Sequence, residues 1–102
     1  MARKVVWSPE AVDDLTSIAG YIERDSPWYA TIVARRLVEL AEESAVFPNA
    51  GRIVPEKANP AVRERFAYRF RLLYHVHDDR IVILTIVHGS RSLVDVLSDP
   101  ER

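Results

Sequence analysis

Hydrophobic side chains in the first half of this chain recur every three to four residues. One such stripe consists of Ala11, Leu15, Ile18 and Ile22. A second consists of Ala30, Val33, Leu37, Leu40, Ala41 and Phe47. This spacing predicts two amphipathic helices, each with one apolar face. Ser8-Pro9 and Ser26-Pro27 stand just before the stripes, and serine followed by proline is a typical helix start. Because the link between the helices is so short, we expect an antiparallel helical hairpin.

The second half has a period of two, which is typical of strands. From Val62 to His77 one parity is apolar and the other is basic; the apolar set is Val62, Phe66, Phe70, Leu72, Tyr74 and Val76, and the basic set is Arg63, Arg65, Arg69, Arg71, His75 and His77. A turn near residues 67–69 could shift the parity between two strands. Asp78-Asp79 is a hairpin signal, and the apolar run 81–87 predicts a central strand covered on both faces.

These patterns predict a single α+β domain over residues 1–102. Val5-Val6-Trp7 is a short strand, the helical hairpin follows, and a three-stranded antiparallel meander completes one sheet, in the order β-α-α-β-β-β. The segment Leu93–Leu97 predicts a short C-terminal helical turn that could cover part of the sheet face left open by the helices; a partner chain is the alternative. A chain of 102 residues with 48% hydrophobic and 28% charged residues is large enough for one core.

Charge is unevenly distributed, although the formal net charge is only −1. Residues 1–51 carry five Lys/Arg against eight Asp/Glu, whereas residues 52–91 carry eight against four. This predicts an acidic helical side and a basic sheet side, with ordinary solvated charge as the alternative. The absence of cysteine excludes disulfides and thiolate metal sites. With no signal-like or membrane-spanning run near the N-terminus, we expect a soluble cytoplasmic protein.

Several short motifs, in this order and spacing, resemble the RelE/ParE toxins of type II toxin-antitoxin systems, in the branch often called plasmid stabilisation proteins. They span nearly the whole chain: Trp7-Ser8-Pro9 with Ala11 and Leu15, Tyr21-Ile22, Ser26-Pro27 with Ala30, Phe47-Pro48 with Gly51-Arg52, Val54-Pro55-Glu56, Arg63-Glu64, the strand Phe70–Val76, and His88 with Arg91. Each motif alone is weak, but the set together is specific.

The resemblance implies a growth-inhibiting toxin that is held inactive in a hetero-oligomer with a cognate antitoxin encoded beside it. Members of the ParE branch act on DNA gyrase and trap its cleaved DNA complex. Members of the RelE branch cut messenger RNA in the ribosome. The two branches share one fold, so the target must be inferred from the site residues.

Arginine, histidine and glutamate side chains in the second half are the candidate site residues. The expected target-binding set is Arg52, Glu56, Arg63, Arg69, Arg71, His88 and Arg91, and the catalytic set of a nuclease would be Arg52, Arg63, Arg71, His88 and Arg91. We expect Arg52, Arg63 and Arg91 to share one cleft, because arginine meets phosphate with a planar fork. Glu64 is expected to face a buried or edge partner such as Arg91.

RNA cleavage without a metal also needs a general base and a general acid. His88 is the candidate for these roles, because histidine as a residue type exchanges protons near neutral pH, although a structural role is the commoner one for a histidine at a strand end. The resemblance implies that members of the nuclease branch carry a tyrosine or histidine after the last arginine. This chain has no Tyr, His or Lys after Arg91. The departure favours a protein that binds rather than cuts.

Apolar residues of the helical hairpin and the sheet are the expected antitoxin contacts. The predicted set is Trp28, Tyr29, Val33, Leu37, Leu40 and Tyr74. No cofactor is implied, and we expect no metal at His75 and His77 because no third ligand is indicated.

Three hypotheses follow. The preferred one is a ParE-like inhibitor of DNA gyrase that is not an enzyme. The alternatives are a ribosome-dependent, metal-independent endoribonuclease, and a relative that has lost toxicity and survives as an antitoxin-binding module.

Overall fold

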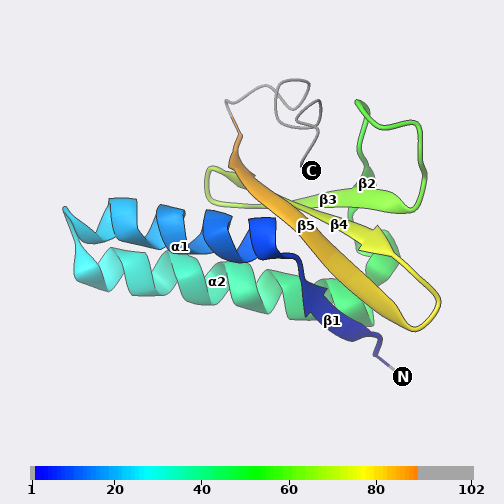
Figure 1. Cartoon of the computed structure of the whole chain (residues 1–102), viewed down its shortest axis with the longest axis horizontal. Helices are drawn as coiled ribbons and strands as arrows, with labels where there is room; N and C mark the ends of the chain where they lie inside the picture. The colour runs from blue at the N-terminus through cyan, green and yellow to red at the C-terminus, as the bar shows by residue number, and fades with distance from the viewer. Residues whose placement is uncertain (1, 90–102) are drawn as a thin grey trace.

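The computed structural model describes residues 2–89, which form a helical hairpin packed on one face of a five-stranded sheet (Figure 1). The elements are β1 (Lys4–Trp7), α1 (Pro9–Glu23), α2 (Pro27–Val46), the 3-10 turn η1 (Pro48–Ala50), β2 (Arg52–Ile53), β3 (Val62–Ala67), β4 (Phe70–Val76) and β5 (Arg80–His88). This confirms the predicted α+β class and element order. The predicted helical turn at Leu93–Leu97 lies outside the described residues.

Serine caps begin both helices, as the sequence predicts. The Ser8 hydroxyl accepts a hydrogen bond from the Ala11 amide at 3.0 Å and donates one to the Leu84 carbonyl at 2.9 Å. The Ser26 hydroxyl accepts from the Tyr29 amide at 3.1 Å and makes no second bond within the described chain. Ser8 therefore caps α1 and also ties its start to the sheet.

The strands lie in the order β1-β5-β4-β3-β2. β1 runs parallel to β5, with Val5 beside Ile81, and the remaining neighbours are antiparallel. The central position of β5, between β1 and β4, confirms what its unbroken apolar run predicts. β2 was not predicted: its two residues are too short for a periodic pattern, and only their pairing with β3 makes them a strand.

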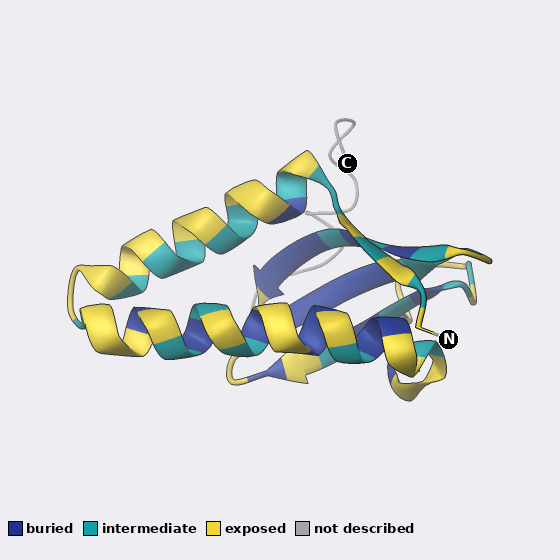
Figure 2. Cartoon of the chain, turned by 90° about the horizontal axis from the view of Figure 1, so that it is seen from below, coloured by how far each residue is buried: buried dark blue, intermediate teal, exposed yellow. Residues whose placement is uncertain are grey.

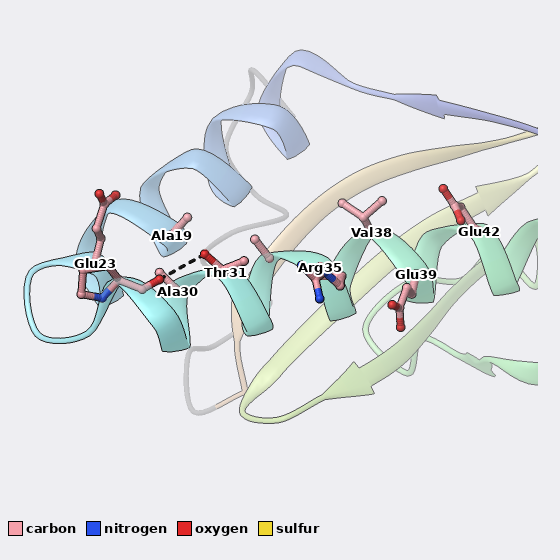
Figure 3. Close-up of a pocket in the computed structure, with 10 residues that line it drawn as sticks. Ala19, Glu23, Ala30, Thr31, Arg35, Val38, Glu39 and Glu42 are labelled. Atoms are coloured by element: carbon pink, nitrogen blue, oxygen red, sulfur yellow. Dashed lines mark hydrogen bonds between the residues drawn. The ribbon is translucent and has the colours of Figure 1, made fainter.

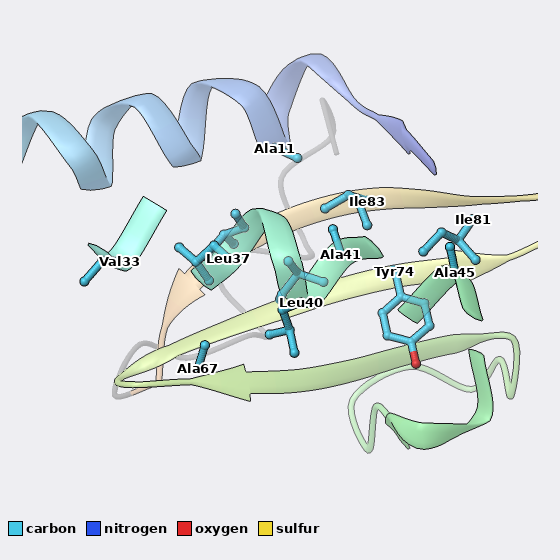
Figure 4. Close-up of a cluster of buried hydrophobic side chains, with 12 residues drawn as sticks. Ala11, Val33, Leu37, Leu40, Ala41, Ala45, Ala67, Tyr74, Ile81 and Ile83 are labelled. Carbon is cyan, nitrogen blue, oxygen red and sulfur yellow. The ribbon is translucent and has the colours of Figure 1, made fainter. Parts of the chain in front are cut away.

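The main core lies between α2 and the sheet (Figure 4). Seven residues of α2 are buried, whereas Ala11 is the one fully buried residue of α1, and Figure 2 shows buried positions along α2 toward the sheet. Four predicted antitoxin contacts belong to this core: Val33, Leu37, Leu40 and Tyr74. Their assignment to a partner surface was wrong, because the apolar stripe that suggested a groove is the one that α2 needs to pack on the sheet. Phe47, predicted as part of the stripe, lies at the end of α2 and is 65% exposed.

The turn between β3 and β4 reverses the predicted faces of β3. Because Phe66 pairs with Arg71 and Arg65 pairs with Leu72, odd positions of β3 share a face with even positions of β4. Arg63 and Arg65 therefore lie on the helix side, while Glu64 and Phe66 lie with Arg71 on the face away from the helices. The predicted basic face holds for β4 and is wrong for β3.

A second, smaller apolar cluster lies on this other sheet face. It consists of Val54, Val62, Leu73 and Val87, with Leu84 packed against it. Val54 comes from the segment that follows β2, so this segment covers part of the face that the helices leave open.

Candidate functional site

Five charged and aromatic residues gather on the sheet face away from the helices, and we call them the arginine cluster. They are Arg52 of β2, Glu56 of the following loop, Glu64 and Phe66 of β3, and Arg71 of β4. The strand register brings them together, since Arg52 pairs with Glu64 and Phe66 pairs with Arg71.

Glu64 is the centre of the cluster. Its carboxylate is fully buried and accepts a hydrogen bond from Arg52 Nε to Oε1 at 2.5 Å. Arg71 donates to the other oxygen, Oε2, through Nε at 3.1 Å and also through Nη2. A buried carboxylate is tolerated only when it is paired and hydrogen-bonded, and both oxygens of Glu64 meet this condition.

The cluster is electrically neutral in formal charge, because two guanidinium groups stand beside two carboxylates. Arg71 is only 8% exposed, and its Nη2 lies 3.7 Å from Glu56 Oε1 in addition to its bonds to Glu64. The Arg52 side chain is 60% exposed. Arg52 is therefore the cation that the cluster presents to solvent, and Arg71 is committed to internal pairing.

Phe66 is the part of the cluster that the sequence reasoning missed as a site residue. The centroid of its ring lies 5.5 Å from the guanidinium carbon of Arg52 and 5.6 Å from that of Arg71, which is the range of cation–π attraction. The residue is 50% exposed. Its place in an apolar parity set concealed it, and the pairing with Arg71 would have been the signal.

Arg63 does not join the arginine cluster. It pairs with Tyr74 on the helix side of the sheet, and its Nη1 donates to the Gly51 carbonyl at 2.8 Å. Arg91 lies outside the described residues. The expected shared cleft of Arg52 and Arg63 was therefore wrong, because adjacent strand residues point to opposite faces and Glu64, not Arg63, faces Arg52. Glu64 has the buried partner that was expected in kind: among residues 2–89 it pairs with Arg52 and Arg71, and the suggested pairing with Arg91 falls outside this range.

Arg69 and His88 lie elsewhere, in an apolar groove of about 470 Å³ that we call the tyrosine groove. It is lined by Ser17, Ile18, Tyr21, Ile22, Tyr29, Tyr68, Arg69, Phe70 and His88. The exposed His88 ring packs edge-on against Phe70, with 5.7 Å between ring centroids. Tyr68 has a positive φ of 55°, unusual for an aromatic residue, and its ring packs on Tyr29 at 6.1 Å.

A shallow groove between the helices is lined by residues of α1 and α2 alone (Figure 3). Small residues such as Ala19 and Ala30 line it together with Val38, and Glu23, Glu39 and Glu42 make it acidic. Trp28 lies in the first turn of α2, near the hairpin tip, and is 74% exposed.

Two further properties of residues 2–89 bear on the site. No group of three His, Asp or Glu side chains in this range is arranged to hold a metal ion. No helix in the same range is long and apolar enough to cross a membrane.

The sequence matches a family model described as the ParE toxin of the type II toxin-antitoxin system parDE, over residues 5–93. The chain belongs to this ParE toxin family. It is 35% identical over 89 residues to the protein named Toxin RelE2 of Caulobacter vibrioides. The matched region covers 86% of this chain and 97% of the relative. The family resemblance inferred from the motifs is confirmed.

Solved structures show the same fold as this ParE family member. The chromosomal ParDE system of P. aeruginosa has a TM-score of 0.68 at 24% identity and covers 85% of this chain and 96% of that one. The complex RelBE2 of Mycobacterium tuberculosis has a TM-score of 0.64 at 21% identity, with coverage of 86% and 99%. A free-state mutant of E. coli RelE has a TM-score of 0.68 at 17% identity, with coverage of 94% and 93%.

Proposed function

We propose that this ParE family toxin inhibits DNA gyrase by binding it, cuts no RNA itself, and is neutralised by a cognate antitoxin. The observation that supports this is the internal pairing of the arginine cluster. Two of the arginines that a nuclease would aim at a scissile phosphate are instead bonded to the buried carboxylate of Glu64.

Metal-independent RNA cleavage needs cations free to stabilise the phosphate, with a general acid and a general base beside them. The arginine cluster contains no histidine, lysine or tyrosine, and Arg71 is already paired with two carboxylates. A phosphate that displaced Glu64 from Arg71 would leave a buried carboxylate with fewer partners, which is costly. The cluster is therefore better suited to a protein contact than to phosphoryl chemistry.

The antitoxin contact is proposed for the exposed aromatic residues of the hairpin. Trp28 and Tyr29 keep this assignment from the predicted set, since Trp28 is largely exposed and Tyr29 lines the tyrosine groove. Aromatic anchors in an apolar groove are typical of protein interfaces. Two structures with the same fold support this partner class, since one belongs to a ParDE toxin-antitoxin system and the other is a RelBE2 toxin-antitoxin complex.

A supercoiling assay with purified gyrase and relaxed plasmid tests the function. We expect a concentration-dependent loss of supercoiling, restored when the product of the neighbouring antitoxin gene is added. Unaltered supercoiling at a large molar excess of toxin would reject gyrase as the target. Growth that continues normally after induction of the toxin alone would favour the non-toxic relative.

The nuclease alternative is supported by Arg69 and His88, which line the tyrosine groove together, and by the name of the RelE2 relative. A histidine beside an arginine has the residue types that acid–base chemistry on RNA requires. Mapping of messenger RNA ends after induction separates the two functions. New ends in phase with codons would support the nuclease, and an unchanged pattern of ends in growth-arrested cells would support gyrase binding.

A further inference from the structure

We propose that Phe66 is the aromatic anchor of the target-binding surface and that Glu64 is a positioning residue that holds Arg52 beside it. Together Phe66 and Arg52 would recognise a carboxylate that stands next to an apolar patch on a protein partner. This inference rests on the proposed function, because it assigns the surface that the target contacts.

Phe66 is a large aromatic residue of β3 that remains half exposed, so a partner could bury the exposed part of its ring. Half of the residue is accessible on the sheet face away from the helices, and two guanidinium groups lie 5.5 Å and 5.6 Å from the centre of its ring. Covering such a ring removes apolar area from water, which favours binding. Aromatic residues and arginine dominate the residues that carry binding energy at protein interfaces.

Glu64 determines how Arg52 is presented. Within the described chain the hydrogen bond of Arg52 to Glu64 runs through Nε, while the side chain remains largely exposed. Among residues 2–89 the terminal nitrogens of Arg52 make no hydrogen bond, and two parallel N–H groups of a guanidinium match a carboxylate. A long arginine side chain that is already held loses less conformational freedom when it binds.

The charge of the cluster favours a protein over a nucleic acid. Arg71 is paired internally, so one outward cation remains beside an exposed ring. Surfaces that grip nucleic acid unaided carry several free cations along the backbone path. A single guanidinium next to an aromatic ring fits a carboxylate at the edge of an apolar patch.

Phe66→Ala tests the anchor, with Phe47→Ala as the matched control because Phe47 is also exposed but lies at the end of α2. We expect F66A to weaken gyrase binding by about 30-fold, the loss typical of an interface anchor, and to reduce growth inhibition in parallel. F47A should change neither. Far-UV circular dichroism and urea unfolding establish that both variants are folded.

Glu64→Gln and Arg52→Ala, alone and combined, test positioning. Each single variant is expected to weaken gyrase binding by about tenfold, and E64Q should cost no further binding in the R52A background, because Glu64 acts through Arg52. A purely structural Glu64 would give additive losses. Additive losses therefore overturn the positioning role.

Growth inhibition separates failure of this inference from failure of the proposed function. F66A that remains as toxic as the wild type overturns the anchor even when gyrase is inhibited. A toxic wild type without effect on gyrase, with F66A non-toxic, overturns gyrase as the target and keeps the anchor. A wild type without toxicity overturns both. If F66A instead loses affinity for single-stranded RNA, the partner is a nucleic acid and the protein assignment is wrong.

Discussion

At the scale of single residues, Gly51 shows how closely the chain packs next to the site. Its backbone is extended, with φ of −77° and ψ of 150°, so its backbone angles do not require glycine. The lack of space around Gly51 does require glycine. The Gly51 amide donates to the buried Tyr74 hydroxyl at 3.1 Å, and that hydroxyl donates to the Pro48 carbonyl at 2.7 Å. Gly51 thereby positions the start of β2, which carries Arg52.

Gly51→Ala is predicted to destabilise the fold by about 2 kcal/mol, as overpacking in a tight site does. The added methyl group would lie 2.8 Å from the Glu64 carbonyl oxygen and would also meet the Tyr74 hydroxyl. Gly20→Ala is the control, because nothing lies within 4 Å of the added carbon and alanine favours a helix by about 0.5–1 kcal/mol. Urea unfolding measures both variants; equal stability of the two would contradict the packing argument.

The partly buried side chain of His75 is expected to make the fold less stable in mild acid. Burial lowers the pKa of His75 from its ordinary value of 6.5, and the charges of His77, Lys57 and Arg80 lower it further. A lowered pKa means that the unfolded chain binds the proton more tightly, so this contribution is present above pH 6.5 and is lost as the pH falls through the folded-state pKa.

The free energy of unfolding of the wild type should therefore fall below about pH 6.5, and that of His75→Gln should fall less steeply. Urea titrations at a series of pH values between about 5 and 8 measure the two slopes. Identical slopes in the two proteins would show that His75 contributes nothing to the pH dependence.

At the scale of elements, the two serine caps differ in what they connect. Ser8→Ala removes the cap of α1 and the bond to the Leu84 carbonyl on β5. Ser26→Ala removes one exposed cap bond. We expect losses of about 2 kcal/mol for S8A and about 1 kcal/mol or less for S26A, in thermal or urea unfolding. A larger loss for S26A would contradict this order.

Elements with a long periodic pattern could be predicted from the sequence, and those defined by pairing could not. Both helices follow from repeated spacing, and β5 follows from a long unbroken apolar run. β2 is two residues long, and the facing of β3 depends on one turn, whose register makes Phe66 a neighbour of Arg71. The stripe of α2 was predicted, but whether Leu37 and Leu40 face a partner or the sheet depends on tertiary packing.

At the scale of the whole molecule, several arginines of the predicted basic sheet side are paired with carboxylates inside the fold. Arg52 and Arg71 bond to Glu64, and Arg65 lies 3.5 Å from Glu43 of α2. These partners stand 7 to 22 positions apart in the chain, so composition alone does not show that they neutralise each other. Arg52, Glu56 and Arg71 were candidates by residue type, while their grouping with Glu64 and Phe66 in the arginine cluster depends on the fold.

The most direct test of a toxin that acts by binding is its equilibrium affinity for purified gyrase at increasing salt. Because one outward cation remains in the arginine cluster, we predict a stable complex whose affinity falls by less than about tenfold between about 0.05 and 0.3 M salt. Absence of binding to gyrase, together with an affinity for RNA that falls steeply with salt, would contradict the account.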